Sequence, residues 1–179
     1  MGKFIFGIII GILLICAGVY LYFSTGMAPV ATAAQAMPFE KRMASMALHK
    51  RVEKEMPKTV PIQPDESNMV AGAQIYKDNC SVCHGLPNQP QTSISKGMFP
   101  KPPQLFKGHG VTDDPPGETY WKTANGIRLT GMPAFKNSLN DDQLWQVSVM
   151  LANADKLPPS AANLLSNAQP TLQAKSRGR

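Results

Sequence analysis

The longest apolar run of the chain lies at its N-terminus, where residues 4–23 are twenty consecutive positions without a charge. About twenty apolar residues in a helix cross roughly 30 Å of hydrocarbon, so we predict that residues 1–24 are a transmembrane anchor. A cleaved signal peptide is the alternative, because the small residues of Ala31–Ala33 and Ala34–Ala36 resemble cleavage sites. Secretory apolar regions are typically about 7–15 residues long and lie closer to the cleavage site, which favours the anchor.

The pattern then becomes polar and rich in small residues. Residues 25–38 predict a flexible connector. Residues 39–56 are rich in helix formers and bounded by prolines, which predicts a helix whose apolar positions are divided between two faces. This weak stripe leaves two interpretations open, a solvated spacer helix or a helix that docks on a partner subunit. Three prolines in residues 57–64 predict an extended hinge, so residues 25–64 form the predicted connector.

Two segments of helical periodicity bound the predicted folded domain, residues 65–158. The first starts at the capping residue Asp65 and ends at a pair of cysteines. The second starts at Asn140, with Gln143 in the capping-box position, and ends at two prolines. In both segments apolar residues recur at helical spacing: Met69, Ala73 and Tyr76 in the first, Leu144, Val147 and Leu151 in the second.

The chain between these two helices has little periodicity. Residues 85–116 contain seven prolines and four glycines, so an irregular path is expected, and a stretch this long needs something to wrap around in a compact domain. A short helix from Glu118, which Asn125 and Gly126 can end, follows this stretch. Strand patterns are nearly absent, so the predicted fold class is all-α.

The formal net charge of +6 is unevenly distributed along the chain. Residues 1–64 carry seven basic and three acidic side chains, residues 65–165 carry eight and nine, and residues 166–179 carry three and none. The central domain is therefore nearly neutral, and no nucleic-acid partner is expected. We predict that residues 159–179 form a basic, flexible tail, which is either simply solvated or contacts acidic lipid head groups or an acidic protein face.

The candidate chemistry lies in the stretch NCSVCHG, where Cys80 and Cys83 precede His84. A structural zinc site would need a second pair of Cys or His ligands, and only the isolated His49 and His109 remain. A thioredoxin-like redox pair would need an α/β pattern around it, which is missing. Cys-x-x-Cys-His is the attachment motif of c-type haem. Cysteines at i and i+3 lie on adjacent helical turns, where they can form thioethers with the porphyrin while the histidine points at the iron.

A second iron ligand is expected from the stretch TGMPAF, which contains Met132 forty-eight positions after His84. Gly131 and Pro133 restrict the backbone on both sides, so that the thioether can point inward. The chain has ten methionines, and most methionines serve packing or lie on the surface. The flanking Gly131 and Pro133 distinguish Met132 from the other methionines as the candidate ligand.

With these motifs in this order, residues 65–157 resemble the class I monohaem cytochromes c. The resemblance rests on a capped helix ahead of CSVCH, a proline-rich loop containing PPQL, the segment NGIRLTGMPAF, and a final helix with Leu144 and Trp145. It implies a class I cytochrome c fold, a small helical shell around one covalently bound haem c, here preceded by a transmembrane helix. In that family the first and last helices cross in contact, which Gly72 would permit, with Tyr76 and Leu144 or Trp145 packed there.

The resemblance also implies roles for individual residues. Cys80 and Cys83 would form the thioethers, and His84 and Met132 would be the axial ligands of the iron. The carbonyl group of Pro103 would accept the Nδ1 proton of the histidine, which would orient the ring and raise its donor strength. The other expected neighbours of the haem are Leu105 on the proximal side, and Trp121 and Arg128 near the distal pocket and the propionates.

Ligation by histidine and methionine would leave no open iron position, so electron transfer is expected rather than catalysis. Lys3 and the positive-inside rule place the domain on the periplasmic face of a bacterial inner membrane. We expect an anchored carrier between a quinol-oxidising complex or dehydrogenase and a terminal oxidase or reductase. The alternatives are a permanently bound cytochrome c subunit of a larger membrane redox enzyme, and a haem sensor or peroxidase-like enzyme, which would require Met132 to leave the iron.

Overall fold

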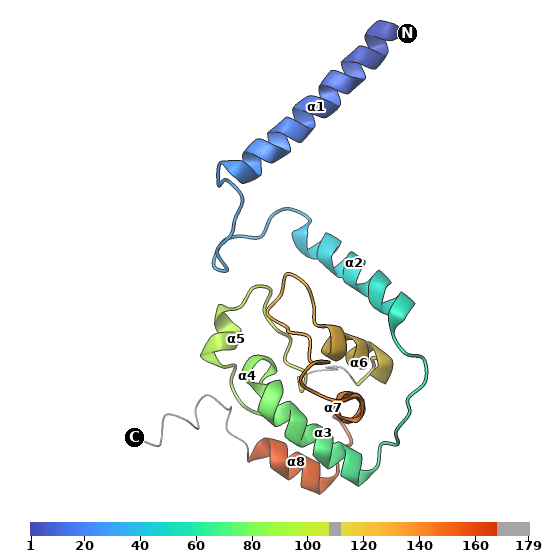
Figure 1. Cartoon of the computed structure of the whole chain (residues 1–179). Coiled ribbons are helices and arrows are strands. Elements are labelled where there is room, and N and C mark those ends of the chain that lie inside the picture. The colour runs from blue at the N-terminus through green and yellow to red at the C-terminus, as the bar shows by residue number, and fades with distance from the viewer. Residues whose placement is uncertain (108–111, 168–179) are drawn as a thin grey trace. The chain divides into compact units, whose positions relative to one another are not determined.

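The computed structural model describes residues 1–107 and 112–167, and all regular secondary structure in these ranges is helical (Figure 1). No strand occurs in them, which confirms the all-α prediction for this part of the chain. The chain divides into two compact units, Met1–Met43 and Ala44–Arg179. The helices are, in chain order, α1 (Gly2–Ser24), α2 (Glu40–Glu55), α3 (Glu66–Asn79), α4 (Ser81–His84), α5 (Ser93–Gly97), α6 (Pro116–Asn125), α7 (Asp141–Ala152) and α8 (Pro159–Ser166).

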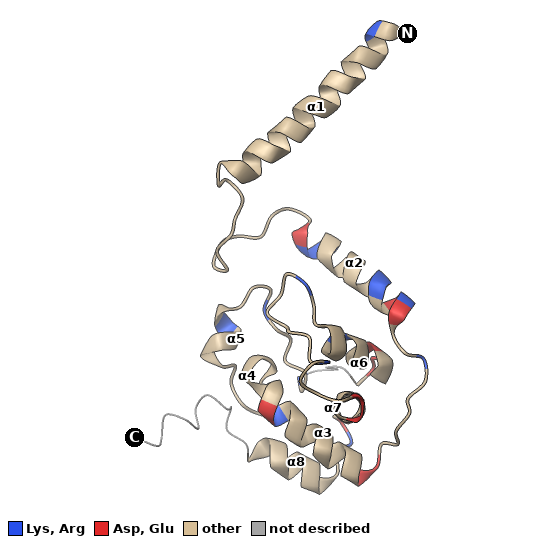
Figure 2. Cartoon of the chain, in the orientation of Figure 1, with Lys and Arg blue, Asp and Glu red and all other residues tan. Residues whose placement is uncertain are grey.

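Helix α1 has 23 residues and forms most of the first unit. At a rise of about 1.5 Å per residue, its length is about 34 Å. Figure 2 shows charge on α1 only at the turn that carries Lys3. By length and composition, α1 is able to cross a membrane.

The core of the second unit forms where α3 packs against α7 and α8. A Cβ atom on Gly72 would lie 2.7 Å from Cβ of Met150 and would also meet the carbonyl oxygen of Gln146. The helices can therefore cross this closely only because Gly72 has no side chain. The atoms nearest to this Cβ belong to Gln146 and Met150, which lie one helical turn apart on α7. The expected packing of Tyr76 with Leu144 or Trp145 stays a prediction.

The predicted helix ends are confirmed at three places. The side chain of Asp65 accepts a hydrogen bond of 2.8 Å from the backbone nitrogen of Asn68 at the start of α3. Asn140 and Gln143 form a complete capping box at the start of α7. Gly126 ends α6 with a φ angle of +67°. Residues with a side chain rarely adopt such an angle, which is why glycine is common at this position.

The flexible tail was predicted to begin at residue 159, but the structure has a helix there. Residues 159–166 form α8, and its residues Ala161 and Leu165 are fully buried against the core. Ser160 also donates a 2.6 Å hydrogen bond to the Glu66 carboxylate of α3. The basic residues that suggested a tail lie beyond residue 167, outside the described residues, whereas Ala161 and Leu165 have the i, i+4 spacing of a buried helix face.

The boundary of the folded domain also differs from the predicted one at residue 65. The second unit begins at Ala44 and includes most of α2 and the proline-rich segment after it. Trp121 of α6 donates a 3.3 Å hydrogen bond from Nε1 to Glu55 of α2, and a Cβ atom on Gly117 would meet the carbonyl oxygen of Pro57. The later part of α2 therefore packs on its own domain and is not a fully solvated spacer.

An aromatic contact joins α6 to α7 and makes the stability depend on pH. The rings of Tyr120 and Trp145 stack with their centroids 4.3 Å apart, and the Tyr120 hydroxyl donates a hydrogen bond to Asp141. This hydrogen bond is the main reason that the pKa of Tyr120 is raised from 10.0 to about 12. The folded state therefore favours the neutral phenol. This contribution is complete below pH 10 and is lost as the pH rises through about 12.

We expect Tyr120→Phe to lower the free energy of unfolding by about 1 kcal/mol near neutral pH, because one hydrogen bond to a charged acceptor is lost at a partly exposed site. The difference between the parent chain and the variant should shrink as the pH rises from 10 to 12. Denaturant unfolding of both proteins at several pH values measures this difference. A difference that stays constant over the whole range would contradict the role of the Tyr120 hydroxyl.

Candidate functional site

The two cysteines and the histidine lie on one short helix that continues from α3. Cys80 ends α3 and begins α4, and its carbonyl oxygen accepts hydrogen bonds from the backbone nitrogens of Cys83, at 3.1 Å, and His84, at 2.9 Å. Ser81 strengthens the junction by donating a 2.7 Å hydrogen bond to the carbonyl oxygen of Lys77. The two thiols therefore lie one helical turn apart, and neither forms a disulfide.

The ring of His84 is held by the backbone of the proline-rich loop. Its Nδ1 atom lies 2.9 Å from the carbonyl oxygen of Pro103, as the resemblance implied. Because a carbonyl oxygen only accepts, Nδ1 carries the proton and Nε2 keeps its lone pair. Burial lowers the pKa of His84, while the hydrogen bond to Pro103 partly opposes this shift. The histidine is thus held as a neutral imidazole, the form that ligates a metal through Nε2.

The turn after the histidine is held from two sides. Gly85 has a φ angle of +77°, and its carbonyl oxygen accepts a 2.7 Å hydrogen bond from the hydroxyl of the fully buried Tyr76. Burial raises the pKa of Tyr76, so the hydroxyl keeps its proton. A Cβ atom on Gly85 would lie 2.5 Å from Oε1 of Gln104, so the amide of Gln104 lies directly against this turn.

Helix α5, which the sequence pattern did not predict, connects the cysteine motif to the methionine loop. Thr92 caps α5 by accepting a 3.1 Å hydrogen bond from the backbone nitrogen of Ser95, and it donates one of 2.6 Å to the carbonyl oxygen of Val82. Met98 follows α5, and a Cβ atom on Gly131 would meet its terminal methyl group. The cysteine motif and the residue before Met132 are thus linked through one short helix.

The loop that carries Met132 is closed by hydrogen bonds of its backbone. The backbone nitrogen of Ile127 donates to the carbonyl oxygen of Met132 at 3.2 Å, and the hydroxyl of Thr130 accepts from the backbone nitrogen of Met132 at 3.1 Å. Further along, the backbone nitrogen of Phe135 donates to the carbonyl oxygen of Thr123 in α6 at 3.0 Å. The position of Met132 is thereby tied to the end of α6, and the residue is half-buried.

These residues fit a covalently attached haem. Two thiols lie one helical turn apart, and burial keeps them protonated, because it raises the pKa of Cys80 to about 12 and raises that of Cys83 as well. The imidazole beside them has its Nε2 atom available for iron. Two buried side-chain atoms, Oγ of Ser95 and Nε2 of Gln104, have no hydrogen-bond partner in the described part of the chain. Both are donors, and a group that carries carboxylates can supply their acceptors.

The other expected neighbours of the haem take different positions. Leu105 is half-buried and packs against the core cluster that contains Tyr76. Trp121 is directed to Glu55 of α2, and Arg128 is exposed in the loop after α6. Their roles beside a haem remain predictions.

Several residues that organise the site have no role in the sequence analysis. Gln104 lies inside the PPQL motif, directly after the proline whose carbonyl holds the histidine, so its place in the motif could have identified it. Thr92 precedes Ser95 by three positions, which is the spacing of a helix cap. Met98 has no comparable signal in the sequence, because its contact with Gly131 depends on the path of two loops.

Comparison with known proteins gives two similarities. Residues 67–149 match the family model described as cytochrome C oxidase, cbb3-type, subunit III, a range that includes the cysteine motif and Met132. None of the curated proteins matches this chain. A chain of the reducing HAO-like protein complex of Kuenenia stuttgartiensis has 25% sequence identity and a TM-score of 0.45, over 57% of this chain and 52% of that chain. This chain thus spans about half the length of that relative, and a likeness of this size carries no argument about function.

Proposed function

Because residues 67–149 form a c-type cytochrome domain, we propose that this protein is a membrane-anchored carrier of single electrons and not an enzyme. The observation that carries the proposal is the CSVCH turn, on which the Nδ1 atom of His84 lies 2.9 Å from the Pro103 carbonyl oxygen. This contact supports metal ligation, since it leaves Nε2 unprotonated and orients the ring.

The proposed cofactor is one haem c. Cys80 and Cys83 would hold it through thioethers, and His84 and Met132 would ligate its iron. When bound, the haem supplies one-electron chemistry at its iron. Ligation by both His84 and Met132 would leave no open position at the iron for a substrate, which is why we propose electron transfer rather than catalysis.

The residues around the motif keep the site rigid and dry. Tyr76 holds the turn after the histidine, and its ring packs edge-on against Phe106 with the centroids 5.0 Å apart. Leu86 is buried in the same cluster. Apolar surroundings and a backbone-anchored histidine reduce the rearrangement of protein and water that accompanies a change of charge.

We propose that α1 anchors the chain in a bacterial inner membrane with the domain on the periplasmic side. The length and apolar composition of α1 support the anchor, and Lys3 at its N-terminal end supports the orientation. The tethered domain would take electrons from a quinol-oxidising complex or dehydrogenase and pass them to a terminal oxidase or reductase. Tethering keeps the domain near such complexes and raises its effective concentration there.

A second candidate function keeps the chemistry and changes the assembly. The matched family is described as a subunit of a cbb3-type cytochrome c oxidase, which favours a fixed subunit of a larger redox enzyme. Purification of the full chain in mild detergent separates the two proposals. A partner that remains in constant ratio at high salt supports the subunit, whereas a chain that elutes alone supports the carrier.

Replacing Met132 tests whether its sulfur ligates the iron. In the oxidised protein we expect Met132→Ala to remove the methionine-to-iron charge-transfer band at the red end of the absorption spectrum. The midpoint potential should fall by on the order of 0.1 V, a fraction of the roughly 0.8 V range that axial ligands control. Met27→Ala, in the exposed connector, is the matched control and should change neither quantity. A band that survives Met132→Ala would show that another group ligates the iron.

A further inference from the structure

Helix α2 carries an apolar stripe that is covered by its own domain. Val52 is only 2% exposed. Leu48 and Met56, four residues before and after it, lie on the same side of the helix and are half-buried. The hydrogen bond from Trp121 to Glu55 secures this side of α2 on α6. This stripe therefore needs no further partner.

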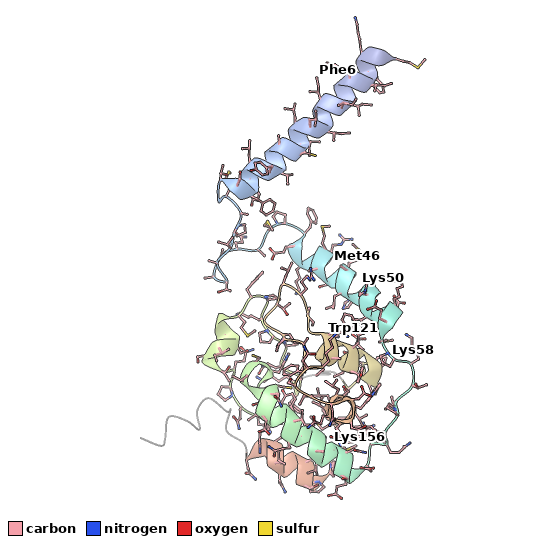
Figure 3. All side chains as sticks on the ribbon, viewed as in Figure 1. Phe6, Met46, Lys50, Lys58, Trp121 and Lys156 are labelled. Carbon is pink, nitrogen blue, oxygen red and sulfur yellow. The ribbon has the colours of Figure 1, made fainter. Side chains whose placement is uncertain are left out.

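A second group of apolar side chains lies at the N-terminal end of α2, on the side opposite the covered stripe, and is exposed. Phe39, Met43 and Met46 are 72%, 63% and 58% exposed. Met43 and Met46 are three positions apart and lie on one side of the helix, and Phe39 directly precedes its first residue. In Figure 3, Met46 and Lys50 point away from the rest of the domain. The exposed group is therefore confined to the half of α2 that lies nearer to α1 in the sequence.

The charges of α2 favour an anionic partner. Its five basic residues outnumber its three acidic residues. Two of the basic residues form ion pairs, Lys50 with Glu53 at 2.9 Å and Arg51 with Glu55 at 2.6 Å. The three remaining cations are exposed and have no ion pair in the described part of the chain: Lys41, Arg42 and Lys54. By helical spacing Arg42 and Lys54 lie beside the exposed methionines, whereas Lys41 lies on the side of Leu48 and Val52.

The length of the connector places a bilayer within reach of this exposed group. Residues 25–39 join the end of α1 to the start of α2. Fifteen residues span at most about 50 Å when fully extended. A surface that is held this close is present at high effective concentration, so that even a weak interaction is populated.

From these observations we propose that the side of α2 with Phe39, Met43 and Met46 binds the head-group region of an anionic phospholipid bilayer. The apolar side chains would enter the interface while Arg42 and Lys54 contact lipid phosphates. This proposal rests on the proposed anchoring by α1. Because Val52, on the opposite side of α2, is buried, lipid contact would also set which side of the haem domain faces the membrane.

The test uses the full haem-loaded chain in lipid nanodiscs, with an environment-sensitive dye at Met46→Cys in a Cys16→Ser background. We expect a blue shift of the emission and the loss of most quenching by aqueous iodide in discs containing phosphatidylglycerol, relative to detergent. High salt or Arg42→Gln with Lys54→Gln should weaken both effects. The matched control is the same dye at Lys156→Cys, an exposed position in the same unit that should not respond (Figure 3).

Each contrary outcome has a distinct meaning. A chain that does not enter the discs overturns the anchoring by α1 and this proposal with it, whereas an incorporated chain with an unchanged dye at position 46 overturns this proposal alone. An equal response in phosphatidylcholine discs overturns the assignment to anionic lipid. A response that needs an added co-purifying protein shows that the exposed group binds a protein and overturns lipid binding. Met43→Glu, an exposed change, should abolish the shift without affecting the fold.

Discussion

Replacing Cys80 and Cys83 together with alanine is expected to remove all covalently held haem from the chain. The two thiols lie one helical turn apart on α4, and of the three cysteines only these adjoin the histidine. No other pair of cysteines can therefore supply two thioethers to one porphyrin. The measurement is a haem stain after denaturing electrophoresis, together with the intact mass of the protein.

Cys16→Ala is the matched control, because Cys16 lies in α1, outside the cytochrome domain. It should leave both the stain and the mass increment unchanged. Each single replacement, Cys80→Ala or Cys83→Ala, should retain a haem through one thioether at reduced yield. Covalent haem in the double variant would contradict the proposed attachment, and loss of haem in the control would place the attachment elsewhere.

Gly72→Ala is expected to destabilise the domain by about 2–3 kcal/mol, because one added methyl group overpacks the crossing of α3 and α7. The new Cβ atom would lie 2.7 Å from Cβ of Met150 and still closer to the carbonyl oxygen of Gln146. The carbonyl oxygen belongs to the helix backbone, so the contact can be relieved only by moving one helix away from the other. Denaturant unfolding of the haem-loaded protein measures the change.

Gly97→Ala is the control for this substitution. Gly97 is also helical, at the end of α5, but no atom lies within 4 Å of the position of its Cβ. Its free energy of unfolding should change by less than about 1 kcal/mol, with stabilisation as the expected direction. Equal destabilisation of the two variants would show that the loss at Gly72 is not caused by the helix crossing.

The sequence was sufficient to predict features that depend on residues close together in the chain. The caps at Asp65 and Asn140 follow from side chains within three positions of the helix starts, and the end of α6 follows from the lack of a side chain at Gly126; the structure confirms all three. The contact between His84 and Pro103 spans nineteen positions and is not local. It was expected only because the PPQL motif resembles that of a known family.

Features that depend on packing between distant segments were missed. Charge near the C-terminus suggested a tail, but the apolar residues of α8 bury themselves against the core that α3 and α7 form. The two faces of α2 looked like a weak stripe because one face is covered, with Val52 only 2% exposed, which periodicity alone does not reveal. The role of Met98 is the least accessible from the sequence, since its contact with Gly131 depends on the path of two loops.

The loop between α6 and α7 holds the proposed ligand Met132 mainly through backbone groups, so its conformation depends little on the other side chains of the loop. Its closure uses the backbone groups of Ile127, Met132 and Phe135, with Thr130 as the contributing side chain. Leu129 in the same loop is 92% exposed. Substitutions at such a position can therefore alter the surface that a partner meets while the methionine keeps its place. Evolution could in this way change the partners of the protein without rebuilding its redox centre, whereas an inserted residue would change both.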